Sequence, residues 1–220
     1  IMKKTGHEAA ARRHAFKSVS RAFRVVAFLA GVDLTVINHE AIPTDEPVLY
    51  VGNHRSYFDI VLTWFLCADM TGYVAKPAVE KVPLLGSRMR DNRCLSIDRE
   101  NNREALKTIL KGIEYLKEDT SMFIFPEGTR ATSPDGALLP FKEGSLKLAE
   151  KSGRKIIPVA ITNCDAIYER QAPRLKPSHV IIEYLDPIDT TLLTKEEKKG
   201  LGAKIQASIQ EACIKNQKDI

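Results

Sequence analysis

The chain has 220 residues, of which 44% are hydrophobic and 28% are charged. This composition is ordinary for a globular domain and argues against a disordered, collagen-like or coiled-coil protein. Lys and Arg outnumber Asp and Glu by 33 to 28, and the net charge of +5 indicates an anionic partner: a nucleic acid, an anionic lipid or a phosphorylated substrate.

The first predicted element is a helix over residues 8–31. Its apolar residues recur at spacings of three and four, and basic residues lie between them: Phe16, Val19, Phe23, Val26, Ala27 and Ala30, with Arg12, Arg13, Lys17, Arg21 and Arg24. A basic amphipathic helix of this kind can lie in the headgroup plane of an anionic membrane. The alternative is a helix whose apolar face docks on the rest of the domain.

From residue 34 onward, short apolar runs alternate with helical patterns. Buried strands are predicted at 48–51, 73–75, 94–97, 122–125, 156–161 and 180–184. Helices are predicted at 60–67, 102–117 and 146–151, and a capping box of Thr194 and Glu197 opens a C-terminal helix. This alternation predicts an α/β fold: a single domain with a mixed, largely parallel sheet flanked by helices, plus the N-terminal amphipathic helix.

The cysteines and the apolar runs indicate in which cellular compartment the chain is expected. Cys67, Cys94, Cys164 and Cys213 lie far apart and form no CxxC pair, which favours reduced, buried thiols in an intracellular chain. No apolar run reaches 18 residues, and no segment resembles a secretory leader. We therefore expect neither a membrane-spanning helix nor a signal peptide in this sequence.

The first chemical motif follows the strand at 48–51. It contains His54 and, five residues later, Asp59. A carboxylate that accepts the Nδ1 proton of a histidine fixes its tautomer and leaves Nε2 as a general base. Ser56 and Asp59 also resemble a helix N-cap with its acidic partner, and this structural role is compatible with the catalytic one.

The second motif, Phe-Pro-Glu-Gly-Thr-Arg, spans residues 125–130. A strand that breaks at Pro126 delivers Glu127, Gly128, Thr129 and Arg130 at its carboxyl end, where open α/β sheets bind ligands. Gly128 allows close approach of the backbone, and Arg130 offers a fork for a phosphate or carboxylate. The alternative is an ordinary turn with a surface ion pair.

Two more cations follow predicted strands. Lys76 comes directly after the strand at 73–75, and Arg99 follows the strand at 94–97. Together with Arg130 they make an anion site more plausible than any one of them alone. The sequence contains no G-x-S-x-G, Walker A, G-x-G-x-x-G or H-E-x-x-H motif, which argues against common serine hydrolases, P-loop NTPases, dinucleotide enzymes and zincins.

In order along the chain, these motifs resemble the four blocks of the glycerolipid acyltransferase family, whose best-known members are the lysophosphatidic acid acyltransferases. The blocks are Asn53-His54-xxxx-Asp59, Ile97-Asp98-Arg99, Phe125 to Arg130 and Ile157-Pro158-Val159. The segments at 76–77, 82–86 and 141–144 also resemble connecting parts of the family. The resemblance extends over about residues 35 to 190 and implies a membrane-contacting helix at 1–33 and an acyltransferase domain at 34–220.

The resemblance implies acyl transfer to the hydroxyl of lysophosphatidic acid, with phosphatidic acid as product. His54 would be the general base and Asp59 its orienting acid. Lys76, Arg99 and Arg130 would hold the acceptor phosphate, with Glu127, Gly128 and Thr129 completing the substrate site. The donor would be acyl-CoA or acyl-carrier protein, with no metal or cofactor, no nucleic acid partner, and a peripheral or monotopic position on the cytoplasmic face of a membrane.

Three alternatives stay open. The acceptor could instead be glycerol-3-phosphate, a lysophospholipid with a headgroup or a lyso-aminolipid. The chain could also be a non-catalytic lipid-binding adaptor, or an acyl hydrolase that uses His54 and water. Arg93 stands where the family usually has glycine, and we expect it to add charge to the phosphate site or to narrow it.

Overall fold

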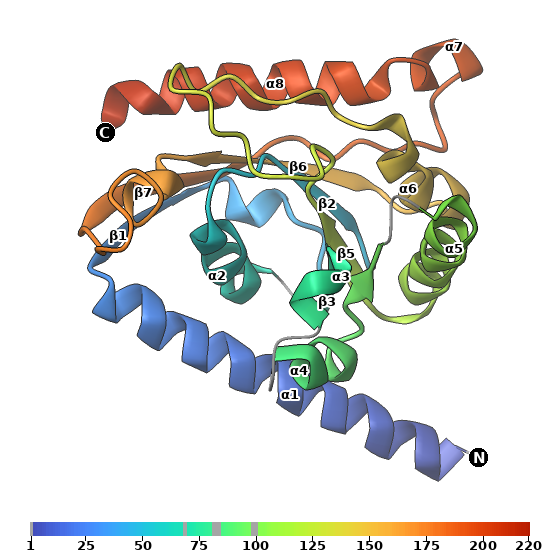
Figure 1. Ribbon diagram of the computed structural model, residues 1–220. Helices are drawn as coiled ribbons and strands as arrows, with labels where there is room; N and C mark the ends of the chain where they lie inside the picture. Colours follow the sequence, from blue (N-terminus) through green and yellow to red (C-terminus); the bar gives the residue numbers. More distant parts are fainter. Residues whose placement is uncertain (1, 68–69, 81–84, 98–100) are drawn as a thin grey trace.

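Among residues 2–67, 70–80, 85–97 and 101–220, which the computed structural model describes, seven strands form one sheet in the order β1-β7-β6-β2-β5-β3-β4 (Figure 1). The strands are β1 (Val32–Ile37), β2 (Leu49–Gly52), β3 (Thr71–Ala75), β4 (Leu95–Ser96), β5 (Ser121–Ile124), β6 (Ile156–Thr162) and β7 (Ser178–Tyr184). All six predicted strands are present, within a few residues at each end.

The sheet is mixed but largely parallel. Five neighbouring strands run in one direction: β6, β2, β5, β3 and β4. Strand β7 is antiparallel to β6, and β1 pairs with β7 in parallel. In the register of β2 and β5, Val51 pairs with Ile124. The two motif-bearing loops therefore leave the sheet side by side at the same edge. The predicted α/β class is confirmed.

Helices cover both faces of this sheet. They are α1 (Met2–Leu29), α2 (Tyr57–Leu66), α3 (Pro77–Glu80), α4 (Leu85–Asp91), α5 (Asn102–Glu118), α6 (Lys147–Ser152), α7 (Lys195–Lys198) and α8 (Leu201–Asn216). Figure 1 shows α8 lying across one face and α1 and α2 on the other, with α5 and α6 on the side of α8.

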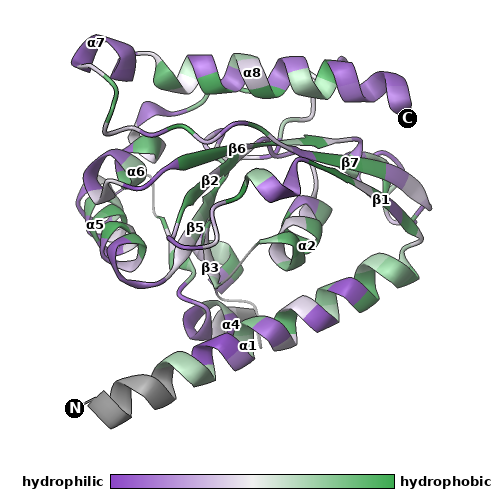
Figure 2. Cartoon of the chain, turned by 180° about the vertical axis from the view of Figure 1, so that it is seen from behind, coloured by the Kyte–Doolittle hydropathy of each residue, from purple (hydrophilic) through white to green (hydrophobic). Residues whose placement is uncertain are grey.

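The central strands are apolar on both faces because both faces are covered, as is usual for parallel sheets. In β2 and β5, Leu49 and Met122 point into the core under α5, α6 and α8. Tyr50 and Phe123 point the other way, toward α2, with their rings stacked at 5.7 Å. Figure 2 shows this continuous hydrophobic sheet between helices of mixed hydropathy.

A row of aromatic rings crosses the layer between the sheet and α1. The rings are in contact pair by pair, with centroid separations of 4.2 to 5.3 Å. In order, the row consists of Phe16, Trp64, Tyr73, Phe123, Phe125 and His54. It thus connects α1 to the loop that follows β2.

The predicted N-terminal helix is confirmed, but its apolar stripe packs on the domain. Phe16 stacks on Trp64, Phe23 meets the same ring edge-on at 5.7 Å, and Ala27 and Ala30 are buried. A second apolar set at the C-terminal end of α1 is exposed: Val25, Val26, Phe28 and Leu29. No helix among the described residues is long and apolar enough to span a membrane.

Strand β1 and helices α3 and α4 were not predicted from the sequence, and the C-terminal helix differs from its prediction. Strand β1 was not predicted, although its apolar and polar residues alternate as in a half-buried strand; partly buried positions alternate with the exposed Asp33 and Thr35, and its partner β7 is far away in the chain. The capping box of Thr194 and Glu197 is confirmed, but the helix that it opens, α7, has four residues. Gly200, with φ of 75°, then begins α8 as a separate helix.

Arg93 lies at the opposite edge of the sheet from the motif loops, because it precedes β4. Its backbone has φ of 55°, in the region that favours glycine. Its side chain forms ion pairs with Glu118 at 2.7 Å and Asp119 at 2.8 Å and lies over the ring of Tyr115. The expectation that Arg93 charges or narrows the phosphate site is therefore wrong, because its side chain anchors the C-terminal end of α5.

Candidate active site

The loop after β2 is organised by the start of α2. Ser56 is the N-cap: its Oγ accepts the N–H of Phe58 at 2.9 Å, and its own N–H donates to Asp59 at 2.7 Å. This capping box was one of the two interpretations of the sequence. It makes Asp59 a buried residue of the first helical turn, facing back toward the loop.

Asp59 also faces His54. His54 Nδ1 lies 2.8 Å from Asp59 Oδ2, and the same oxygen accepts the N–H groups of Arg55 and Ser56, each at 2.7 Å. The imidazole stacks on Phe125 with ring centroids 4.2 Å apart. Its Nε2 has no hydrogen-bond partner in the part of the chain that the structure describes. The pair can therefore hold a neutral imidazole with Nε2 available to take a proton.

Glu127 supports the histidine from the neighbouring strand. Its Oε1 accepts the backbone N–H of His54 at 2.7 Å, and its Oε2 accepts that of Leu139 at 2.8 Å. The side chain is buried, and this burial raises the pKa of Glu127, while the two N–H groups act in the opposite direction. In this structure Glu127 holds the backbone of the motif loops together.

The turn after β5 is made by Gly128, with φ of 76°. The N–H of Gly128 is used within the turn, because it donates to the carbonyl of Phe125 at 3.0 Å. The next two N–H groups, of Thr129 and Arg130, have no partner among the residues described. Two adjacent N–H groups near His54 are an arrangement that can receive a developing negative charge.

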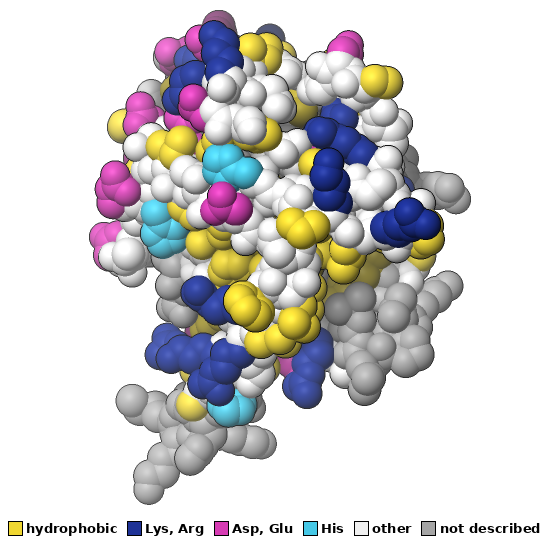
Figure 3. Space-filling model, turned by 90° about the vertical axis from the view of Figure 1, so that its left-hand side faces the viewer, with side chains coloured by type: hydrophobic (Ala, Val, Ile, Leu, Met, Phe, Trp, Pro, Cys, Tyr) yellow, Lys and Arg dark blue, Asp and Glu magenta, His cyan; other side chains and the backbone are white. Residues whose placement is uncertain are grey.

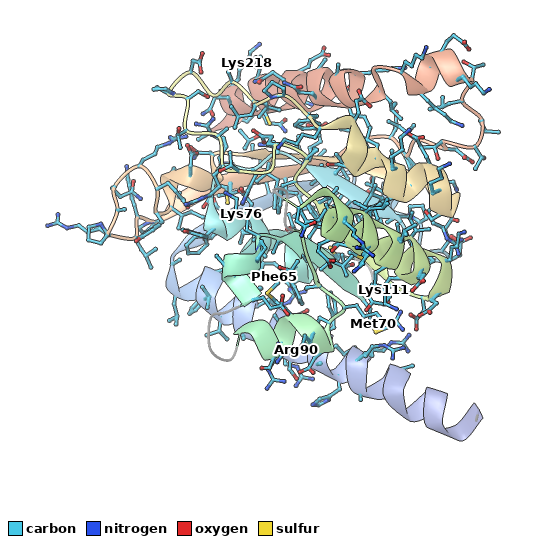
Figure 4. The ribbon with its side chains drawn as sticks, turned by 45° about the vertical axis from the view of Figure 1, so that its right-hand side comes forward. Phe65, Met70, Lys76, Arg90, Lys111 and Lys218 are labelled. Carbon is cyan, nitrogen blue, oxygen red and sulfur yellow. The ribbon has the colours of Figure 1, made fainter. Side chains whose placement is uncertain are left out.

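Lys76 reaches this turn from β3. Its Nζ lies 3.4 Å from Thr129 Oγ1, so the structure brings together two residues that the sequence singled out separately. Figure 4 shows Lys76 at the carboxyl end of β3 and Met70 at the opposite end. Lys76 is thus on the same edge of the sheet as the two motif loops.

Arg130 turns toward α2. Its guanidinium lies over the ring of Tyr57, 3.8 Å from the centroid, and its Nη1 is 3.0 Å from Glu169 Oε1. A cavity of about 990 Å³ is bordered by Arg130, Glu169 and Arg55, and its other walls include the loop at 131–138, the segment at 161–165 and the C-terminal end of α8. Arg99, together with its neighbours 98 and 100, lies outside the described residues, as does part of the segment at 82–86.

Sequence reasoning missed two residues of this site. Tyr57 and Glu169 hold Arg130, but Tyr57 occupies an unspecified position of the first motif and Glu169 lies outside all four motifs. An aromatic residue next to the N-cap of α2 was a weak signal for Tyr57. Glu169 lies in the segment between β6 and β7, and nothing in its spacing links it to residue 57.

The sequence matches the family model named Acyltransferase over residues 33–162. It is 29% identical over 185 residues to the 1-acyl-sn-glycerol-3-phosphate acyltransferase of Saccharomyces cerevisiae, covering 84% of this chain and 61% of the yeast protein. It is 31% identical over 173 residues to the Salmonella typhimurium protein of that name, covering 78% of this chain and 69% of the relative.

A solved structure is also similar. The crystal structure of the 1-acyl-sn-glycerophosphate acyltransferase of Thermotoga maritima superimposes with a TM-score of 0.80 at 26% identity, covering 95% of this chain and 82% of that one. The chain spans 61% of the length of the yeast relative and 58% of the Limnanthes alba relative. These similarities cover both motif loops and the sheet that positions them.

Proposed function

Because the chain belongs to the acyltransferase family, we propose that it transfers an acyl chain from an acyl thioester to the free hydroxyl of lysophosphatidic acid, giving phosphatidic acid. The observation that carries this proposal is the pair of His54 and Asp59, 2.8 Å apart, beside the turn at Gly128. The relatives named above supply the acceptor, since each is named for 1-acylglycerol phosphate.

In the proposed mechanism, Nε2 of His54 removes the proton of the acceptor hydroxyl as its oxygen attacks the thioester carbonyl. Asp59 holds Nδ1 and stabilises the imidazolium that forms. The tetrahedral intermediate collapses with cleavage of the C–S bond, and the departing thiolate takes the proton from His54. A new ester and a free thiol result, with no acyl-enzyme intermediate, because a thioester is already an activated donor.

We assign the other predicted residues around this step. The backbone N–H groups of Thr129 and Arg130 would donate to the oxyanion, since no described residue uses them. Lys76 and Arg130 would hold the acceptor phosphate, and Arg99 stays a predicted third cation. The chemistry as written needs neither a metal nor an organic cofactor.

We also propose that the enzyme works at the cytoplasmic face of a membrane, attached peripherally. Phe28 and Leu29 at the end of α1 are 81% and 75% exposed, respectively, and basic side chains of α1 lie near them. Figure 3 shows hydrophobic side chains beside Lys and Arg on the lower part of one face of the molecule. Apolar and basic groups together favour an anionic bilayer surface, and the four free thiols fit a reducing compartment.

The function is tested with acyl-CoA or acyl-carrier protein and a panel of acceptors in mixed micelles, with product mass as the readout. We expect phosphatidic acid from lysophosphatidic acid with the wild type and none with His54→Ala. Product from another acceptor alone would keep the chemistry and change the substrate. No product with either donor would favour the non-catalytic adaptor, and release of free fatty acid would favour the hydrolase.

Membrane attachment is tested by co-sedimentation with vesicles that contain anionic lipid. Replacing Phe28 and Leu29 together by Ser should weaken binding by about tenfold or more, because two large apolar side chains no longer enter the interface. Leu192→Ser is the matched control, since Leu192 is 80% exposed but lies beside α7 rather than on α1. Equal binding of all three proteins would contradict the assignment of α1.

A further inference from the structure

Arg130 is held on two sides, by Tyr57, which occupies an unspecified position of the first motif, and by Glu169, which lies outside all four motifs. Tyr57 lies under the face of its guanidinium at 3.8 Å, and Glu169 accepts from its Nη1 at 3.0 Å. Arginine has five N–H donors in a planar fork. The described contacts of Arg130 involve only its Nη1 and one face of the guanidinium. The remaining N–H donors are therefore available to bind a phosphate.

Glu169 also connects this arginine to α2, the helix that carries Asp59. The oxygen that accepts from Arg130, Oε1, accepts the backbone N–H of Tyr57 at 2.8 Å. Tyr57 is the first residue of α2 and is separated by two residues from His54. One carboxylate oxygen therefore connects the phosphate-binding fork and the start of the helix that orients the base.

We propose that Glu169 and Tyr57 are positioning residues for Arg130, which fix its guanidinium relative to His54 before the acceptor binds. This inference rests on the proposed function, in which Arg130 binds the phosphate of the acceptor. A long side chain on an exposed loop has many rotamers, and an arginine that is already held loses less freedom when it forms its bonds to phosphate. The affinity for a phosphate-bearing acceptor then depends on residue 169, which lies 39 positions away from Arg130.

In the alternative role, Glu169 competes with the acceptor phosphate for the guanidinium of Arg130. The phosphate would then have to displace the Glu169 carboxylate before it could bind. The two roles predict opposite effects on the Michaelis constant. If Glu169 positions Arg130, removing the side chain raises KM for the acceptor, whereas if it competes, removal lowers KM.

The test measures kcat and KM for lysophosphatidic acid at saturating donor. Glu169→Ala should raise KM about tenfold and leave kcat within about twofold, because binding is lost equally in the ground and transition states. Glu169→Gln retains an oxygen that can accept from Arg130 and from the Tyr57 N–H, so its KM should stay within about threefold of the wild type. Tyr57→Phe keeps the ring and should resemble the wild type, while Tyr57→Leu should raise KM.

A second variant background separates positioning from general damage. If Glu169 acts through Arg130, Glu169→Ala should raise KM no further in a protein that already carries Arg130→Ala. An equal rise in both backgrounds, or a KM for Glu169→Ala at or below that of the wild type, would overturn the inference. An active Arg130→Ala protein with unchanged KM would instead overturn the proposed phosphate site itself, so the two failures are distinguishable.

Discussion

The loops after β2 and β5 leave neighbouring parallel strands at one edge of the sheet, yet they use their backbone N–H groups in opposite ways. In the first loop, the N–H groups of residues 54–57 all donate to carboxylates, which belong to Glu127, Asp59 and Glu169. In the second loop, the N–H groups of residues 129–130 have no partner within the described chain. The backbone donors of the first loop are all satisfied, which suits a loop that holds the proposed base, while the second loop leaves two N–H groups open for the proposed oxyanion.

The largest effect should come from the first loop. His54→Ala removes the base, and we expect a loss in kcat of about 10²- to 10⁴-fold or more, because general-base catalysis contributes that much. The fold should persist, since Asp59 keeps its two backbone donors. Acyl transfer measured by mass spectrometry, beside thermal unfolding, checks both statements.

His14→Ala is the control for this variant, because His14 is exposed on α1. It should retain wild-type turnover. A folded His54→Ala protein with near-wild-type turnover would remove His54 from the mechanism.

A smaller but still large effect is expected from Asp59→Asn. The amide can offer an oxygen to the N–H groups of Arg55 and Ser56, but it is neutral and no longer stabilises an imidazolium. We expect kcat to fall by about 10²- to 10⁴-fold while KM for the acceptor changes little. Steady-state kinetics decides this, and a large change in KM with constant kcat would contradict the orienting role.

The role of the open N–H groups in the second loop is tested by substituting Gly128. Gly128→Ala places a Cβ at φ of 76°, which costs about 1–2 kcal/mol and displaces the turn that presents the N–H groups of Thr129 and Arg130. We expect kcat to fall about tenfold to a hundredfold, given the magnitudes measured for single oxyanion donors. Steady-state turnover and denaturant unfolding are the measurements.

Gly200→Ala is the matched control. Gly200 has φ of 75°, nothing lies within 4 Å of the added Cβ, and it does not border the cavity beside Arg130. It should therefore show a similar loss of stability with unchanged turnover. Equal turnover in both variants would mean that the open N–H groups of the second loop play no part in the reaction.

The smallest effect should come from the far edge of the sheet. Arg93→Gly loses the ion pairs with Glu118 and Asp119 but relieves a backbone at φ of 55°, while Arg93→Ala only loses contacts. The glycine variant should be more stable than the alanine variant by about 1 kcal/mol, as measured by denaturant unfolding. Neither should change the preference among acceptors, and a change would return Arg93 to the substrate site.

The parts of the site that could be predicted from the sequence are those determined by residues close together in the chain. The spacing of His54 and Asp59 fits one turn at the start of a helix, and a strand that breaks at Pro126 must present the next residues at its end. Their placement at one edge followed from the parallel sheet.

The remaining parts depend on contacts between distant segments. Glu169 accepts the backbone N–H of Tyr57, which lies 112 residues earlier in the chain, and no repeat or spacing in the sequence predicts this contact. The Arg93 side chain is held by ion pairs with Glu118 and Asp119, which lie about 25 residues further along the chain. Strand β1 depends on pairing with β7, where Val32 lies opposite Ser178. Local patterns carry none of this information.

The row of rings that begins at Phe16 and ends at His54 has a mechanical consequence. Asp59 holds one nitrogen of the imidazole, and Phe125 stacks on its face with four further aromatic rings in contact behind it, one pair after another. Rotation of the imidazole would require these packed side chains to move, so the plane of the His54 ring is fixed. The proposed base therefore owes its orientation to packing that starts on the N-terminal helix.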